Sequence, residues 1–259
     1  MGRAAIGGAL AILLAAPPLR AGPVIDLLPH RAAYRLSLAD AESGSRLAEI
    51  RGALVLEWRP ACDGWLSQQR MGFVATSEDG PAFSHDVRFS SWESRDGTQL
   101  RFSVRSFDGP RLEEEFRGHA ALTAPGRGGV ARYRVPEGDS LDLPAGTIFP
   151  TAHLAELIAA AHAGERTLSR HVFDGSGENG LSRATAVIGD PAADDRGDPT
   201  WPVSIAYFRS AEEAALPQFE IAFELAATGV LRDVRLDYGT FVLRAELERL
   251  EPLPRPECR

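Results

Sequence analysis

The chain has 259 residues, 44% hydrophobic and 25% charged, which is the composition of a globular protein rather than a disordered or fibrous one. Its formal net charge is -8 at pH 7, and all 28 basic residues are arginine, because the sequence contains no lysine. The acidic balance argues against general nucleic-acid binding, and the absence of lysine excludes Walker-type lysines and Schiff-base chemistry on this chain.

The N-terminus has the features of a secretory signal peptide. Arg3 supplies a positive tip, and an apolar run follows from Ala4 to Ala16. A run of that length is too short for a bilayer, which needs roughly 20 residues. A small residue precedes the expected cleavage site after Ala21, with Ala16 as the alternative site. We therefore expect residues 1–21 to be removed, residues 22–259 to form one domain, and no transmembrane segment to remain.

Alternating apolar and polar residues dominate the rest of the chain and predict β-strands. Leu100, Phe102 and Val104 alternate with polar residues, and the same period recurs at residues 34–38, 219–225, 234–238 and 241–247. Neighbouring side chains of a strand point to opposite faces, so each such strand has one buried face. Sheets of this kind are usually antiparallel. Roughly twelve to fourteen such segments predict a sheet that curls into a β-barrel or an open barrel.

One segment predicts a helix. Thr151 can act as the N-cap, Leu154, Leu157 and Ile158 follow at helical spacing, and Gly164 ends the segment. This helix of about 12 residues could cover the open side of the curled sheet.

The glycine-rich run at residues 175–180 matches the dinucleotide-binding pattern G-x-G-x-x-G by letter. A dinucleotide site requires a helix after this loop, whereas residues 181–188 read as a strand. We therefore expect a surface turn between strands and no cofactor.

The two cysteines, Cys62 and Cys258, are consistent with an exported protein carrying one disulfide. That bond would close a loop of about 197 residues and restrict the unfolded chain by up to about 5 kcal/mol. Two free thiols or a metal pair are the alternatives, although no histidine is adjacent to either cysteine.

No catalytic or metal site is expected from the six scattered histidines. His85 and Asp86 near Ser84 or Ser90 resemble parts of a hydrolase triad, but a nucleophile elbow is missing, and only geometry decides such a case. The four tryptophans are candidates for an apolar groove inside the curled sheet, with core filling as the alternative. They are Trp58, Trp65, Trp92 and Trp201.

Several blocks of sequence resemble the EipB family of periplasmic cell-envelope integrity proteins. They span about residue 28 to the C-terminus and are weakest between residues 77 and 143. The blocks comprise residues 30–38, 62–65, 149–154, 172–176, 202–208 and 231–239, together with Cys258.

This resemblance implies a spiral of long antiparallel strands, or broken β-barrel, that carries a helix. It also implies a disulfide between Cys62 and Cys258, location in the periplasm and no enzymatic activity. The expected function is to support envelope integrity by binding a partner protein, such as a repeat protein, or an envelope component. The alternative is a carrier of lipid or lipoprotein with an apolar groove, and a periplasmic hydrolase is a third hypothesis.

Overall fold

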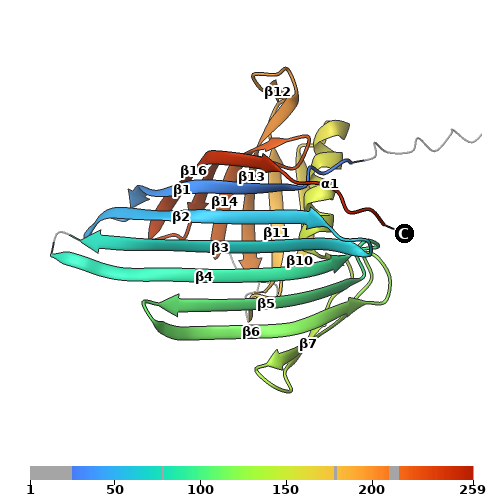
Figure 1. Ribbon diagram of the computed structural model, residues 1–259, viewed down its shortest axis with the longest axis horizontal. Coiled ribbons are helices and arrows are strands. Elements are labelled where there is room, and N and C mark those ends of the chain that lie inside the picture. The colour runs from blue at the N-terminus through green and yellow to red at the C-terminus, as the bar shows by residue number, and fades with distance from the viewer. Residues whose placement is uncertain (1–24, 78, 178–179, 210–215, 259) are drawn as a thin grey trace, which may run out of the picture.

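The computed structural model describes residues 25–77, 79–177, 180–209 and 216–258. The expected signal peptide at residues 1–21 lies outside these residues. The described chain is mostly β-structure with one helix, as predicted, and its long strands β1 to β6 lie side by side (Figure 1).

The described residues form sixteen strands, more than the twelve to fourteen predicted, and the helix α1 (Pro150–Ala163). The first eight strands are β1 (His30–Ala41), β2 (Leu47–Pro60), β3 (Gly64–Ser77), β4 (Gly80–Ser94), β5 (Gln99–Asp108), β6 (Arg111–Leu122), β7 (Gly129–Val135) and β8 (Ser140–Leu143). The remaining eight are β9 (Thr147–Ile148), β10 (Thr167–Phe173), β11 (Leu181–Ile188), β12 (Ala192–Ala193), β13 (Pro199–Arg209), β14 (Phe219–Ala226), β15 (Leu231–Asp237) and β16 (Phe241–Pro252).

All sixteen strands belong to one sheet. Its order is β8-β7-β6-β5-β4-β3-β2-β1-β16-β15-β14-β13-β11-β10-β9, and β12 pairs with β13. The first strand therefore pairs with the last, His30 opposite Pro252 and Leu36 opposite Ala245. Neighbouring strands are antiparallel apart from β9 and β10, which are parallel. The two ends of this order, β8 and β9, are close in sequence, so the sheet is a nearly closed barrel with a seam between them.

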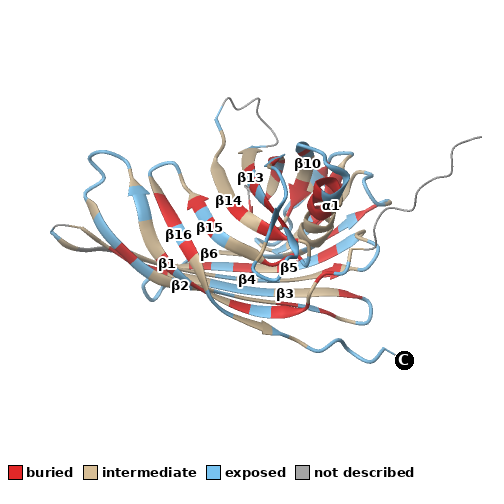
Figure 2. Ribbon diagram, turned by 90° about the horizontal axis from the view of Figure 1, so that it is seen from above, coloured by how far each residue is buried: buried red, intermediate tan, exposed pale blue. Residues whose placement is uncertain are grey.

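Alternation determines which side chains enter the barrel. On β5, Leu100, Phe102 and Val104 are buried while Arg101 and Arg105 are exposed, as predicted. Viewed from above, the sheet curls around α1, and many of the buried residues lie where β10, β13 and α1 meet (Figure 2).

A small aromatic cluster holds the two sides of the seam together. Phe173 from β10 packs edge-on against Phe102 from β5, with ring centroids 5.5 Å apart, and Tyr133 from β7 packs on the same ring at 5.4 Å. Phe149, which precedes α1, joins this cluster and is fully buried. Edge-to-face rings are a favoured aromatic geometry, so these contacts replace the missing strand pairing at the seam.

The glycine-rich loop after β10 packs against this cluster, so its prediction as a surface turn was wrong. Gly175 and Gly177 are buried. A methyl group on Gly175 would lie 2.2 Å from the ring of Phe102, and one on Gly177 would lie 2.4 Å from the ring of Phe116. The loop does connect two strands, but its glycines allow the backbone to lie directly on aromatic rings.

Helix α1 matches the predicted segment, but its first turn is capped differently. Phe149 is the N-cap residue rather than Thr151, and it makes no side-chain capping bond. The carboxylate of Glu93 on β4 accepts hydrogen bonds from the backbone N–H groups of Thr151 (2.7 Å) and Ala152 (3.0 Å) instead. Gly164 ends the helix in the left-handed conformation, as predicted.

Cys62 and Cys258 form a disulfide with their Cα atoms 5.4 Å apart. It attaches the C-terminal tail to the turn between β2 and β3. The tail is also held by the N–H of Leu253, which donates to the carbonyl of Pro29, and by an ion pair between Arg255 and Asp26.

We predict that Gly175→Ala lowers the free energy of unfolding by several kcal/mol. The methyl group adds overpacking, typically 1–3 kcal/mol, to the cost of a left-handed alanine, about 1–2 kcal/mol. Gly197→Ala is the matched control, because Gly197 has a similar φ of +86° with nothing within 4 Å of the added carbon. Urea unfolding of both variants tests this prediction, and equal losses would mean that the seam contact is unimportant.

We also predict that Cys62→Ser with Cys258→Ser lowers the melting temperature, because the unfolded chain regains the entropy that the cross-link removes, up to about 5 kcal/mol. Thermal unfolding of the wild type with and without reductant should show the same loss. An unchanged melting temperature in both comparisons would contradict a stabilising role for the bond.

Candidate functional site

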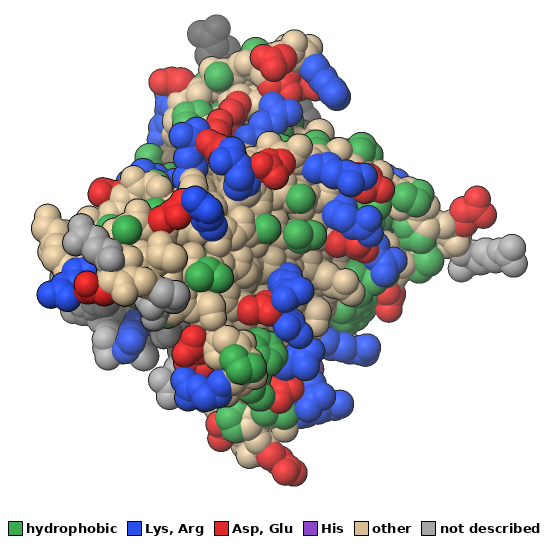
Figure 3. All heavy atoms as spheres, turned by 60° about the vertical axis from the view of Figure 1, so that its left-hand side comes forward, with side chains coloured by type: hydrophobic (Ala, Val, Ile, Leu, Met, Phe, Trp, Pro, Cys, Tyr) green, Lys and Arg blue, Asp and Glu red, His purple; other side chains and the backbone are tan. Residues whose placement is uncertain are grey.

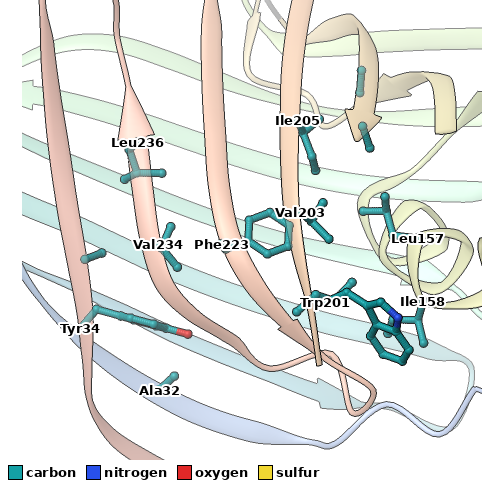
Figure 4. Close-up of a cluster of buried hydrophobic side chains, with 14 of the residues drawn as sticks. Ala32, Tyr34, Leu157, Ile158, Trp201, Val203, Ile205, Phe223, Val234 and Leu236 are labelled. Atoms are coloured by element: carbon teal, nitrogen blue, oxygen red, sulfur yellow. The ribbon is translucent and has the colours of Figure 1, made fainter. Parts of the chain in front are cut away.

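The barrel contains a cavity of about 620 Å³ that is open to solvent on one side, which we call the inner cavity. Its walls come from β2 to β4 on one side, β13 and β14 on the other, and α1. Side chains from β13, β14 and β15 project toward the helix in this region (Figure 4). A cavity of this size is within the range of about 300–1,000 Å³ that is typical of small-ligand sites.

Most of the wall is apolar because it is built from the buried face of each strand. Leu56 of β2 and Phe89 of β4 line the cavity, as do Ile205 of β13, Phe223 of β14 and Leu157 of α1. Leu157 is 2% exposed. The wall thus offers a continuous apolar surface to an occupant, with polar groups at a limited number of positions.

A row of aromatic rings leads from the inner cavity to the rim of the barrel. Tyr207, Phe219 and Tyr238 line the cavity. The row continues through Phe241 and Phe73 to Phe83, and successive ring centroids are between 5.1 and 6.2 Å apart. Phe83 is 38% exposed whereas Phe73 is 6% exposed, so the row runs from solvent into the core.

Two buried histidines stand out among the polar groups of the wall. His30 at the start of β1 is 3% exposed and His153 on α1 is 5% exposed. Burial lowers the pKa of both imidazoles, that of His153 to about 4 with a smaller contribution from the charge of Arg170. Both rings are therefore neutral at pH 7.

Two of the four tryptophans proposed for the groove lie together near the disulfide end of the barrel. Trp58 lines the inner cavity and is 7% exposed. The ring of Trp65 stacks on it, with centroids 4.2 Å apart, and Trp65 packs against the core behind it.

Trp92 lies on the outer face of the sheet. Its neighbours across the strands are Leu66 and Arg101, the guanidinium of Arg101 lies 4.8 Å from its ring centre, and its Nε1 donates to Asp63. It lines a different hollow, of about 680 Å³, together with exposed arginines. The strand register explains this, because Glu93, the next residue, takes the inward position.

Trp201 on β13 is 3% exposed and packs edge-on against His162 of α1, with ring centroids 4.8 Å apart. It belongs to the main core rather than to the cavity wall (Figure 4).

The hydrolase hypothesis finds no support at His85 and Asp86. His85 points inward toward Phe73, whereas Asp86 is on the outer face between Arg70 and Arg88. Hydrogen bonds from these arginines lower the pKa of Asp86 to about 2. Adjacent residues of a strand face opposite sides, so this pair cannot act on one substrate. Within the described ranges, no group of three potential metal ligands is found.

The outer surface carries charges of both signs (Figure 3). Arginine and acidic side chains form ion pairs along the strands, such as Arg35 with Glu248 at 2.8 Å. Within the part of the chain described here, no helix has both the length and the hydropathy to cross a membrane.

Comparison with known proteins identifies related chains. A family model described as EipB-like matches residues 21–254. The cell envelope integrity protein EipB of Brucella abortus is 34% identical over 244 residues, which cover 89% of this chain and 86% of that protein. The crystal structure of a beta-barrel-like protein of the domain of unknown function DUF1849, also from Brucella abortus, superposes with a TM-score of 0.81 at 33% identity. The match covers 89% of this chain and all of that chain.

We predict that His153 makes stability depend on pH. Its pKa is about 6.5 in the unfolded chain and about 4 in the folded protein, so the stability it contributes is complete above pH 6.5 and is lost as pH falls toward 4. Between pH 7 and pH 4.5 this loss is about 2–3 kcal/mol. Burial shifts the pKa of His30 in the same direction.

Urea unfolding at both pH values tests this prediction in His153→Gln, with substitution of the exposed His119 by Gln as the control. The pH-dependent loss should shrink in the first variant only. An identical loss in the wild type and in His153→Gln would contradict a buried neutral imidazole.

Proposed function

Because the chain belongs to the EipB-like family of cell envelope integrity proteins, we propose that it supports the cell envelope. In this proposal the protein is located in the periplasm and holds an apolar envelope component in its inner cavity. The inner cavity carries this proposal, because buried and half-buried apolar side chains make up most of the lining of about 620 Å³ of space. Secretion of the chain is supported by the signal-peptide features of residues 1–21.

The aromatic row supports entry of an apolar molecule from the rim. Phe83 is partly exposed and its ring centroid lies 6.3 Å from that of Phe241. The rings that lead on from Phe241 to Tyr207 are half-buried and can each contact a ligand. A ligand that moves along these rings exchanges one apolar contact for another, so it does not have to be hydrated between the rim and the cavity.

The same features favour the carrier alternative, in which the component is a lipid or the acyl chain of a lipoprotein. In both forms the protein acts by binding and catalyses no reaction. A periplasmic partner protein remains a prediction from the family resemblance.

We predict that filling the inner cavity abolishes both binding and function. Ser91 lines the cavity, so Ser91→Phe places a ring inside it. Ser90, one residue away, is exposed and lines the hollow on the outer face, so Ser90→Phe is the matched control.

Each variant should be produced in a deletion strain and assayed for resistance to detergents and to cell-wall antibiotics. Native mass spectrometry of the protein purified from envelope extracts measures the bound component. We expect Ser90→Phe to restore resistance and to carry the component, and Ser91→Phe to do neither while still folding. Full resistance with Ser91→Phe, or with the gene deleted, would contradict the proposal.

A further inference from the structure

The wall of the inner cavity contains polar atoms that have no partner. Among the described residues, Nε2 of His30, Nε2 of His153 and Oε1 of Gln218 are buried without a hydrogen bond. All three residues line the inner cavity, and they come from β1, from α1 and from the segment just before β14. A buried polar group without a partner costs about 1–3 kcal/mol, so the folded protein has unused hydrogen-bonding capacity at this site.

The partners of neighbouring atoms determine what His30 can bind. Its Nδ1 lies 2.7 Å from the carbonyl oxygen of Leu28, and a carbonyl can only accept, so Nδ1 carries the hydrogen. Burial lowers the pKa of the ring, which is therefore neutral at pH 7. Nε2 of His30 is thus left as an acceptor that requires a donor.

The same reasoning applies to Gln218. Its side-chain nitrogen donates to the hydroxyl of Ser182 at 3.0 Å. With the amide in this orientation, Oε1 has no donor. Two of the three unpartnered atoms are therefore acceptors, and the neutral ring of His153 can take either role.

The charges of the wall exclude an anionic group in the ligand. Among the described residues that line the inner cavity there is no arginine, and the chain has no lysine. Asp174 is the acidic residue of the wall; burial raises its pKa, and its carboxylate accepts from the N–H of Ser176 at 2.8 Å. A phosphate or carboxylate placed here would therefore have no cation in the wall to pair with and would lie near an acidic residue, which is unfavourable for a charge removed from water.

Building on the function proposed above, we propose that the inner cavity selects an uncharged amphiphile: a molecule with an apolar chain and at least two hydrogen-bond donors that reach His30 and Gln218. A monoacylglycerol has this chemistry, because it has two hydroxyl groups and no charge. A fatty acid anion has the same chain but carries a negative charge. A fatty acid methyl ester has the same chain and no charge, but it has no hydrogen-bond donor.

Three probes with the same oleoyl chain test this selectivity: 1-monooleoylglycerol, oleate and methyl oleate. Binding to the purified protein at pH 7.5 is measured by calorimetry and by tryptophan fluorescence, to which Trp58 in the cavity wall contributes. Each hydrogen bond to a neutral partner contributes about 1 kcal/mol, so we expect monooleoylglycerol to bind at least about tenfold more tightly than the other two probes.

Equal or tighter binding of oleate or methyl oleate would overturn the selectivity while leaving an apolar cargo in place. Failure of all three probes to bind would overturn the selectivity and the proposed function together. The experiment therefore distinguishes failure of the selectivity alone from failure of the proposed function.

Two variants test the named acceptors. His30→Phe and Gln218→Met replace them with apolar groups of similar size. Each removes an unsatisfied atom together with one hydrogen bond, to Leu28 or to Ser182, so urea unfolding first establishes that each variant is folded. In each, the preference for monooleoylglycerol over methyl oleate should fall about threefold or more, with methyl oleate binding at least as tightly as to the wild type. Gln68→Met, at an exposed position, is the control and should retain the wild-type preference. A preference that is unchanged in both cavity variants would overturn the proposal.

Discussion

The structure depends on burying one apolar face of a very long sheet. Sixteen strands with alternating side chains can remove that face from water only by curling, and the two ends of the curl then have to be joined. The contact of Phe102 with Phe173 joins them without backbone pairing. The glycine backbone of the loop at Gly175 lies on the same ring and completes the junction. At the seam, apolar packing thus joins the two edges of the sheet, whereas backbone hydrogen bonds join neighbouring strands elsewhere.

Closure leaves space inside the barrel, and α1 only partly fills it. The helix is held at its N-terminus by Glu93, a strand residue whose carboxylate replaces an ordinary cap. Burial raises the pKa of Glu93, whereas the two N–H groups that bind it lower its pKa and favour the charged form. The helix therefore occupies one side of the barrel, and the remaining volume is the inner cavity.

The parts of this structure that depend on local pattern could be predicted from the sequence. Alternation at residues 100–104 places their side chains correctly, and the period of Leu157 and Ile158 predicts the helix that buries them. The disulfide agrees with the prediction made from the number of cysteines and from the signal-peptide features of the sequence. Features that depend on distant partners could not be predicted. The cap from Glu93 and the burial of Gly175 against Phe102 each join segments more than fifty residues apart, and alternation alone does not tell which face of β4 Trp92 occupies. His30 and His153 carry no local signal, because their environment exists only once the barrel has closed.

The pairing of the first strand with the last has a consequence for how the chain is made. β1 has β2 on one edge and β16 on the other. A chain that emerges N-terminus first therefore presents an open strand edge at β1 until its final segment follows, and open edges recruit strands from other molecules. A ribosome that stalls before residue 241 releases a product with that edge permanently unprotected. Truncation near the C-terminus is thus expected to yield self-association rather than a smaller barrel.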